Sequence, residues 1–369
     1  MRVKLGELTK IKTGKLDANA ADVDGLYPFF TCSKEPLKIN KYSYDCECVL
    51  VAGNGDLNVK YYNGKFDAYQ RTYIIEVIAG DRLLPRYLYY FLDAYVEVLR
   101  KQSIGGVIKY IKLGNLTDAV LDLPSLSKQR EVICALDLYN QIVDKRKEQL
   151  TLLDQLVKSR FIEMFGDPVR NDRQWRQSFL KDVTSKIGSG ATPKGGKSSY
   201  LREGISFIRS MNVHDGKFVY KELAYLDTSQ ATALDNVCVE PYDVFVNITG
   251  ASVARSCVVP KDVLPARVNQ HVAIIRPLKS EINAFFLNHQ FLCKPFKNYL
   301  LALGGAGGAT REAITKAQLE QTKIVVPPLD LQNQFADFVA QVDKSKLAVQ
   351  KSIDELETLK KSLMQEYFG

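Results

Sequence analysis

Two stretches of the chain repeat one another: residues 124–166 read PSLSKQREVICALDLYNQIVDKRKEQLTLLDQLVKSRFIEMFG, and residues 327–369 read PPLDLQNQFADFVAQVDKSKLAVQKSIDELETLKKSLMQEYFG. They align without a gap. Near the start, Pro124 and Gln129 correspond to Pro327 and Gln332, and both stretches finish in Phe-Gly. Agreement at both ends of a long ungapped alignment indicates an internal duplication.

Both repeated stretches carry apolar residues at heptad spacing, which is typical of a coiled-coil helix. Each begins with proline and a serine or aspartate that can cap a helix. An amphipathic helix packed on its own domain is the alternative, but polar residues at matching positions, such as Arg146 and Lys346, favour a narrow contact between two helices. The predicted apolar seam consists of Leu136, Val143, Leu150, Leu153, Val157, Val342, Val349, Ile353, Leu356 and Leu363.

The repeat extends upstream of both helices, and strand-like runs mix with helix-like runs in each half, which predicts an α+β fold. The matching pairs are VKLGELTKI (3–11) with FLKDVTSKI (179–187), CVLVAG (48–53) with DVFVNITG (243–250), and AYQRTYII (68–75) with VNQHVAII (268–275). We predict globular domains at residues 1–123 and 167–326, and long helices at 124–166 and 327–369. A pseudo-twofold axis between the copies would pair the two helices as an antiparallel coiled coil.

The composition is that of an ordinary globular protein: of 369 residues, 46% are hydrophobic and 25% charged. The start of the chain, MRVKLGELTK, has no apolar signal region, and no apolar run is long enough to span a bilayer, so we expect a cytoplasmic protein. The net charge of +8 favours a polyanionic partner without identifying it. The seven cysteines and three histidines lack zinc-site spacing, so we predict free thiols and no metal site.

The glycine-rich loop GSGATPKGGKSS, residues 188–199, invites comparison with a nucleotide-binding loop. Gly196, Lys197 and Ser198 fit the end of the Walker A pattern, but Ala191 occupies the place of its first glycine. We therefore interpret the segment as a basic surface loop in which Lys194 and Lys197 are candidates for contact with phosphates.

A basic and aromatic segment in the first half, LNVKYYNGKFDAYQRTY (57–73), offers candidate DNA contacts. Cations can contact phosphates, while Gln and Arg can contact base edges. A β-hairpin turning at Asn63 and Gly64, with packed tyrosines and solvated lysines, is an equally good interpretation. The candidates are Lys60, Tyr61, Lys65, Gln70 and Arg71.

The second half offers further candidates for DNA contact, although each of them is a single residue without a surrounding motif. They are Arg209 and Asn212 in FIRSMNV, Asn269 and Gln270 in VNQHV, and Arg311 in the glycine-marked segment LGGAGGATREAITKAQL (303–319).

Motifs of catalysis are poorly represented in the chain. An adenine methyltransferase carries Asn-Pro-Pro-Tyr, whereas the Pro327-Pro328 pair follows Val326. Asp215-Gly216-Lys217 matches the end of a nuclease pattern without an evident upstream acidic partner. No serine, cysteine or histidine stands in a recognisable nucleophile motif, so we predict a chain that is not an enzyme.

The sequence resembles the specificity subunit of type I restriction-modification systems over essentially its whole length. The resemblance is carried by YPFFTCSKEPLKINKYSYDCECVLVAGNGDLNVKYYNGKFDAYQRTY, LDQLVKSRFIEMFGDP, GSGATPKGGKSSYLREGISFIRSMNVHDGKF, GGAGGATREAITKAQLEQTKIVVPPLDLQNQFADFV and LETLKKSLMQEYFG. These stretches stand in the order found in that family and are much longer than any short motif.

The resemblance implies two target-recognition domains, each reading one half of a bipartite double-stranded DNA site, and helices that set the unread spacer and dock methyltransferase subunits. It also implies that two adenine methyltransferase and two restriction or translocase subunits join the complex. S-adenosylmethionine, ATP and magnesium would be bound by those partners, and no cofactor by this chain. The alternative is a coiled-coil adaptor that binds proteins without reading DNA.

Overall fold

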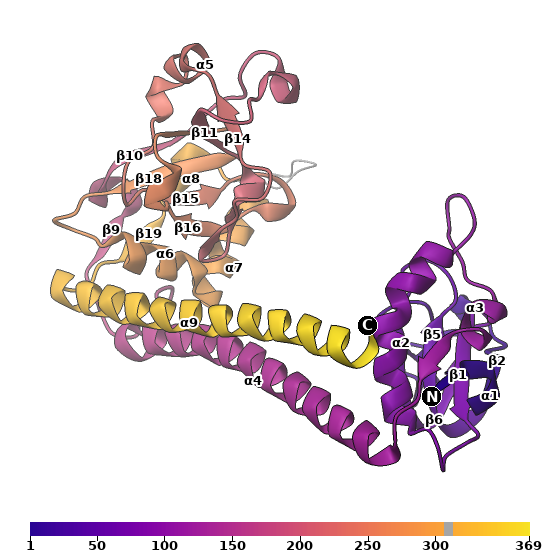
Figure 1. Ribbon diagram of the computed structural model, residues 1–369. Helices are drawn as coiled ribbons and strands as arrows, with labels where there is room; N and C mark the ends of the chain where they lie inside the picture. Colours follow the sequence, from indigo (N-terminus) through magenta and orange to yellow (C-terminus); the bar gives the residue numbers. More distant parts are fainter. Residues whose placement is uncertain (306–312) are drawn as a thin grey trace. The chain divides into compact units, whose positions relative to one another are not determined.

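The computed structural model describes residues 1–305 and 313–369, which form two compact units (Figure 1). Unit 1 contains Met1–Lys147 and Gln350–Gly369, and unit 2 contains Glu148–Val349. The long helices α4 (Leu126–Phe165) and α9 (Leu329–Phe368) each contribute one part to each unit. Unit 1 is therefore built from both ends of the chain.

Unit 1 is organised around a six-stranded sheet with the order β2-β7-β5-β6-β3-β4. Helix α2 (Pro85–Gln102) packs on one face, and proline at its first turn supplies the fixed φ that a helix start favours. The strands are β2 (Thr9–Thr13), β3 (Tyr27–Phe30), β4 (Leu37–Ile39), β5 (Tyr44–Ala52), β6 (Val59–Ala68) and β7 (Thr72–Val77). A second, two-stranded sheet pairs β1 (Arg2–Lys4) with β8 (Val120–Asp122), and α1 (Leu5–Leu8) and α3 (Leu113–Thr117) are short.

The unit 1 sheet is buried on both faces because its central strands are apolar at consecutive positions. Val49 and Val51 of β5 face the cluster under α2, whereas Leu50 faces Phe30 and Phe66 on the other side. The last turns of α9 complete the cluster under α2: the ring of Phe368 lies 5.3 Å from that of Tyr87. Leu363, Met364 and Tyr367 pack against the same cluster.

Unit 2 contains a four-stranded sheet, β10-β18-β15-β16, and a three-stranded sheet, β14-β11-β17. The strands of the first are β10 (Thr184–Ser189), β15 (Val244–Asn247), β16 (Ser256–Val258) and β18 (Val272–Pro277); those of the second are β11 (Ile205–Ile208), β14 (Ala224–Leu226) and β17 (Ala266–Val268). Two small sheets pair β9 (Gln177–Phe179) with β19 (Lys323–Val325), and β12 (Val213–His214) with β13 (Lys217–Phe218). The helices are α5 (Thr228–Thr232), α6 (Ala284–Leu292), α7 (Lys294–Gly305) and α8 (Lys316–Glu320).

The four-stranded sheet of unit 2 also separates two apolar clusters. Val244 and Val246 face a cluster that contains α6 and residues of both long helices, whereas Phe245 faces the three-stranded sheet. In the first cluster, Phe161 of α4 packs against Phe335 of α9 at 5.4 Å between ring centroids. The long helices are thus part of the core of unit 2.

The two units repeat the same topology. Strands β2, β7, β5 and β6 of unit 1 correspond in order and antiparallel pairing to β10, β18, β15 and β16 of unit 2. The threonines Thr9 and Thr184 start matching strands, and each hydroxyl donates to the carbonyl four residues earlier at 2.8 Å. The internal repeat and the α+β class predicted from the sequence are confirmed.

A fully buried glutamine near the start of each long helix attaches that end of the helix to one unit, α4 to unit 1 and α9 to unit 2. In unit 1 the Gln129 Oε1 accepts from Leu84 N at 2.9 Å, and its Nε2 donates to Arg82 O at 2.7 Å. In unit 2 the Gln332 Oε1 accepts from Asn283 N at 2.8 Å, and its Nε2 donates to Glu281 O at 3.2 Å. Both Nε2 groups also donate to a proline carbonyl at the helix start. The matching glutamines of the sequence repeat thus have the same structural task.

The long helices pair antiparallel, as expected. Within unit 1, Lys128 and Tyr139 of α4 contact Tyr367 and Lys360 of α9, each with the lysine Nζ 6.0 Å from the ring centroid. Within unit 2, Asp154 of α4 forms an ion pair of 2.6 Å with Lys346 of α9. Residues later in α4 therefore contact residues earlier in α9, as antiparallel pairing requires.

The predicted seam residues differ in burial along the helices. Leu136, Val143, Val157, Val342, Val349 and Ile353 are buried, whereas Leu150, Leu153, Leu356 and Leu363 are partly exposed. A two-helix contact covers only one side of each helix, so a seam residue there keeps part of its surface in solvent. Among the described residues, no helix is both long and apolar enough to cross a membrane.

Candidate nucleic-acid interface

Polar side chains gather in unit 1 where the central strand β5 ends. The backbone N–H of Gly53 donates to Arg71 O at 2.7 Å, which brings the turn before β7 to this strand end. Asn54 forms a β-bridge with Tyr110, and Ile111 N donates to Gly53 O at 2.9 Å. Three distant segments therefore meet at one place, which we call the strand-end edge of unit 1.

Unit 2 has the same arrangement with different side chains. Ile248 N donates to His271 O at 3.0 Å at the end of β15. Thr249 forms a β-bridge with Ala313, and Ile314 N donates to Ile248 O at 2.8 Å. Thus Thr249, His271 and Ala313 occupy the strand-end edge of unit 2 where unit 1 has an asparagine, an arginine and a tyrosine.

The strand-end edge of unit 2 opens into a hollow of about 670 Å³. Thr249 Oγ1 lies 2.5 Å from His271 Nδ1. The guanidinium of Arg255 forms no ion pair with any residue of 1–305 or 313–369. Hydroxyl and imidazole groups can donate to or accept from base edges, and a guanidinium group can donate to them. The lining residues are Ser210, Met211, Thr249, Gly250, Ala251, Ser252, Arg255, His271 and Ala313.

Of the candidates predicted in unit 2, Gln270 lies exposed beside this edge. Its Oε1 accepts from Thr192 Oγ1 at 2.6 Å, which ties the glycine-rich loop after β10 to the turn before β18. Asn269 is buried, and its Oδ1 accepts from His271 N at 3.0 Å. The described structure therefore gives Asn269 the task of shaping the turn that presents Gln270 and His271.

Arg209 and Asn212 are engaged within unit 2. Asn212 is buried, its Oδ1 accepts from Arg209 N at 3.0 Å, and its Nδ2 donates to Val219 O at 2.9 Å. The Arg209 guanidinium donates to Glu222 O and lies 5.5 Å from the Tyr200 ring. Contact with DNA stays a prediction for both residues. Arg311 lies outside the described residues.

Lys194 and Lys197 are exposed in the loop that follows β10. Gly195 and Gly196 have φ values of +92° and +56°, a left-handed conformation that glycine adopts without strain. The loop leads into a 3₁₀ helix at Gly196–Ser199 and then to β11, whereas a phosphate-binding loop of the Walker type leads into an α-helix. This geometry agrees with a basic surface loop.

The candidates in unit 1 divide between packed and exposed side chains. Tyr61 OH donates to Glu47 Oε1 at 2.6 Å, the Arg86 guanidinium lies 4.7 Å from its ring, and burial raises the pKa of Tyr61 to about 12. Lys60 bonds to Asn58, and burial lowers the pKa of its ammonium group. Both side chains are therefore engaged inside the unit.

Lys65, Gln70 and Arg71 are exposed. The Lys65 Nζ lies 4.8 Å from the Tyr42 ring, and Gln70 Nε2 donates to Asp17 Oδ1 at 2.8 Å. Arg71 and Gln70 stand at the strand-end edge, in the same register positions as His271 and Gln270. Lys65 is near the other end of β6.

The hairpin turn considered at Asn63 and Gly64 is wrong. Residues Val59–Ala68 form one strand, β6, whose pairing with β5 continues across both positions, as Glu47↔Asn63 and Cys46↔Gly64. The Asn-Gly pair is a strong local turn signal, but the long ladder of β5 overrides it.

Three members of the unit 2 hollow, Thr249, Arg255 and His271, were not predicted from the sequence. The alignment of AYQRTYII with VNQHVAII already placed His271 opposite Arg71, and this was the available signal. The sequence carries no such signal for Arg255.

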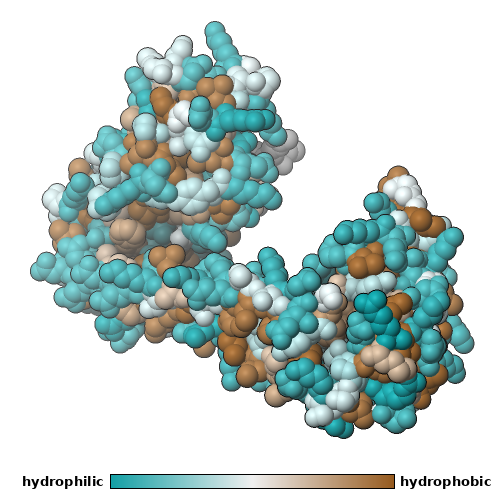
Figure 2. Space-filling model, in the orientation of Figure 1, coloured by the Kyte–Doolittle hydropathy of each residue, from teal (hydrophilic) through white to brown (hydrophobic). Residues whose placement is uncertain are grey.

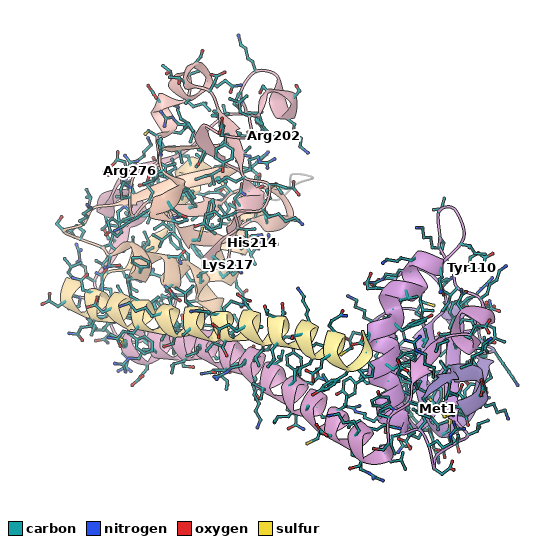
Figure 3. The ribbon with its side chains drawn as sticks, viewed as in Figure 1. Met1, Tyr110, Arg202, His214, Lys217 and Arg276 are labelled. Carbon is teal, nitrogen blue, oxygen red and sulfur yellow. The ribbon has the colours of Figure 1, made fainter. Side chains whose placement is uncertain are left out.

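The nuclease-like triplet is also explained by the fold. Asp215 forms an ion pair with Lys297 of α7, and Gly216 has φ +66° in the turn between β12 and β13, the hairpin that carries His214 and Lys217 in Figure 3. Within residues 1–305 and 313–369, no group of three His, Cys, Asp or Glu side chains has the arrangement of a metal site.

Comparison with protein families explains the repeated architecture. The family model described as type I restriction modification DNA specificity domain matches residues 1–152 and 172–358. The chain belongs to this family. The family resemblance inferred from the sequence is thereby confirmed, and the match covers parts of both units.

Several type I restriction enzyme specificity subunits are similar to the chain. The EcoDI specificity subunit of Escherichia coli is 44% identical over 156 residues, which cover 42% of this chain and 34% of that subunit, so this match spans about a third of the relative. The MjaVIII specificity subunit of Methanocaldococcus jannaschii is 20% identical over 386 residues, covering 98% of this chain and 90% of that one.

Solved structures of type I systems share the fold. The S subunit from M. genitalium matches with a TM-score of 0.59 at 14% identity, covering 100% of this chain and 96% of that chain. A chain from a study of assembly and conformational transition of the type I R-M system matches with a TM-score of 0.62 at 18% identity, covering 100% and 97%. The expected α+β fold with two globular parts and paired helices is confirmed.

Proposed function

We propose that the chain is the DNA-reading subunit of a type I restriction-modification complex, in which each unit reads one half of a bipartite target. The observation that carries this proposal is the duplicated strand-end edge. One backbone framework presents Asn54, Arg71 and Tyr110 in unit 1, but Thr249 and His271 in unit 2. Different polar groups on the same framework suit two different base sequences.

The net charge of +8 supports a polyanionic partner, because cations on the surface neutralise phosphates and release counterions. In this proposal the chain is not catalytic. S-adenosylmethionine, ATP and magnesium are bound by partner subunits, two of them adenine methyltransferases and two restriction or translocase subunits. The complex acts on DNA in the cytoplasm.

The methyltransferase subunits dock, in this proposal, on the outward faces of the long helices. In unit 2, Leu152 and Leu347 are 54% and 72% exposed, and a partner that covered them would remove their apolar surface from water, which is favourable. We expect the double substitution Leu152→Ser with Leu347→Ser to weaken capture of the methyltransferase subunit. Thr151→Ser with Ser345→Thr on the same helices is the matched control, and equal capture by both variants would refute this docking site.

The experiment that tests the reading function is methylome sequencing. The chain and its methyltransferase subunit would be co-expressed in a methylation-free host, and N6-methyladenine would be mapped by single-molecule sequencing. We expect one asymmetric motif made of two short half-sites with a fixed gap. Arg71→Ala is expected to relax one half-site and Arg255→Ala the other, so the untouched half is the internal control in each case.

The adaptor interpretation makes the opposite prediction. A stable complex with an active methyltransferase subunit that leaves the genome unmethylated would contradict sequence reading and favour a protein-binding adaptor. Relaxation of both half-sites by a single substitution would contradict the division of the target between the two units.

A further inference from the structure

A tight loop projects from the strand-end edge of unit 1, directly after helix α2. Ile104 and Tyr110 pair through two backbone hydrogen bonds, 3.0 Å from Ile104 N to Tyr110 O and 2.8 Å from Tyr110 N to Ile104 O. Gly105 has φ +113°, and a Cβ there would lie 2.7 Å from Ile108 O. The turn thus depends on glycine, and it presents residues 106–109 as a tip.

This tip is attached firmly to the strand-end edge. Gly55 N donates to Lys109 O at 2.9 Å, and Tyr73 OH donates to Ile111 O at 3.1 Å. Tyr110, labelled in Figure 3, forms the bridge to Asn54 at the base of the loop. The backbone therefore fixes the tip in place before any partner binds.

The tip is apolar and uncovered within the described part of the chain. Val107 is 102% exposed and Ile108 is 63% exposed. Figure 2 shows apolar surface at the tip of the loop after α2. Because burying such side chains is favourable in proportion to the apolar area removed from water, two neighbouring exposed residues on a rigid turn suit insertion into a partner.

The surroundings of the tip identify the chemistry of that partner. Residues 100–112, RKQSIGGVIKYIK, contain Lys101, Lys109 and Lys112 and no aspartate or glutamate, whereas Arg100 is ion-paired with Asp56 and Glu97. An apolar tip within a cationic segment matches DNA, in which stacked apolar base faces lie between rows of phosphates. A protein surface would instead need an apolar pocket rimmed by acidic groups.

We propose that this tip is an apolar wedge, in which Val107 and Ile108 enter between neighbouring base pairs beside the half-site read by unit 1. Lys109 and Lys112 contact the flanking phosphates. The inference rests on the proposed function, because it places DNA at the strand-end edge. The wedge distorts the DNA in addition to the reading of bases by unit 1. Part of the specificity therefore arises from how easily the base step entered by Val107 and Ile108 unstacks.

The test compares a wedge variant with a matched control in the complete complex of the chain with its methyltransferase subunit. The wedge variant is Val107→Ser with Ile108→Ser. The control is Val23→Ser with Ile78→Ser, because these residues are also exposed in unit 1, at 90% and 64%. Val23 stands between Asp22 and Asp24, whose charges disfavour contact with DNA, and Ile78 lies outside the strand-end edge. Binding is measured on the target duplex found by methylome sequencing, on a scrambled duplex, and on targets with a single mismatch at each step beside the half-site.

We expect the wedge variant to bind the perfect target about 10- to 100-fold more weakly than the control variant. On the duplex whose mismatch already opens the contacted step, the difference should shrink to about threefold or less, because the unstacking cost has been removed. This rescue at one position distinguishes a wedge from a contact with the DNA backbone.

Other outcomes overturn the inference. Equal binding by the two variants on every duplex would refute the wedge while leaving the proposed function intact. Loss of the methyltransferase subunit from the wedge variant, measured by native mass spectrometry, would show that the tip contacts protein. If the unmodified complex binds target and scrambled duplexes equally, the proposed function itself fails.

Discussion

Replacing Gln332 by leucine tests whether the buried glutamine holds α9 to unit 2. The amide of Gln332 forms hydrogen bonds with Asn283 N at 2.8 Å, Pro327 O at 2.8 Å and Glu281 O at 3.2 Å, and the side chain is fully buried. Leucine fills a similar volume but leaves one backbone N–H and two carbonyls without partners. Because each unsatisfied buried group costs about 1–3 kcal/mol, we expect a loss of roughly 3–5 kcal/mol of unfolding free energy.

That loss is large compared with the stability of a typical domain, about 5–15 kcal/mol, and corresponds to a fall of roughly 6–20 °C in the unfolding midpoint of unit 2. Differential scanning calorimetry and urea titration would measure it. The matched control is Gln334→Leu, on an exposed position of the same helix, which should change stability by about 0.5 kcal/mol or less. If Gln332→Leu is as stable as Gln334→Leu, the hydrogen bonds of Gln332 do not hold α9 to unit 2.

Three further expectations concern charge, protonation and helix length. Lys194→Ala with Lys197→Ala should reduce DNA affinity and lower the slope of log affinity against log salt concentration by up to about two, one for each lost phosphate contact. The methylated motif should stay unchanged, and a relaxed half-site would indicate base contact instead. Burial lowers the pKa of His289, whose Nδ1 lies 2.8 Å from Phe285 O, so the unfolded chain takes up the proton first. The contribution of this histidine to stability should therefore be present above a pH of about 6.5 and be lost with acidification, and the loss should be smaller in His289→Gln, as followed by thermal unfolding. One heptad inserted in each long helix adds roughly 10 Å of helix, so the methylome should show a longer spacer and unchanged half-sites; an unchanged spacer would refute this.

The sequence predicts the framework well because its signals are periodic and repeated. Heptads sustained along residues 124–166 and 327–369 predict two paired helices, and the ungapped repeat predicts two similar units. The matching of Gln129 with Gln332 even indicated positions that proved to share a structural task. Such signals depend on neighbours along one element, so tertiary contacts do not alter them.

The strand-end edges could not be read from the sequence in the same way. In unit 2 the edge joins residues at the ends of β11, β15 and β18, and only the strand register shows that Thr249 and His271 are neighbours. Asn212 and Asn269, both candidates for contact with DNA, are buried, and their side-chain amides form hydrogen bonds with backbone groups of unit 2. The sequence alone does not show which amides are engaged in this way.

The packing of Phe368 on Tyr87 has a consequence for how the protein is made. Unit 1 obtains part of its apolar cluster from Leu363, Met364, Tyr367 and Phe368, which the ribosome synthesises after the whole of unit 2. A nascent chain therefore exposes the apolar surface around Tyr87 and Phe91 until translation of α9 is finished. Chains that stop early keep this surface uncovered, which offers proteases and chaperones a way to recognise an unfinished product.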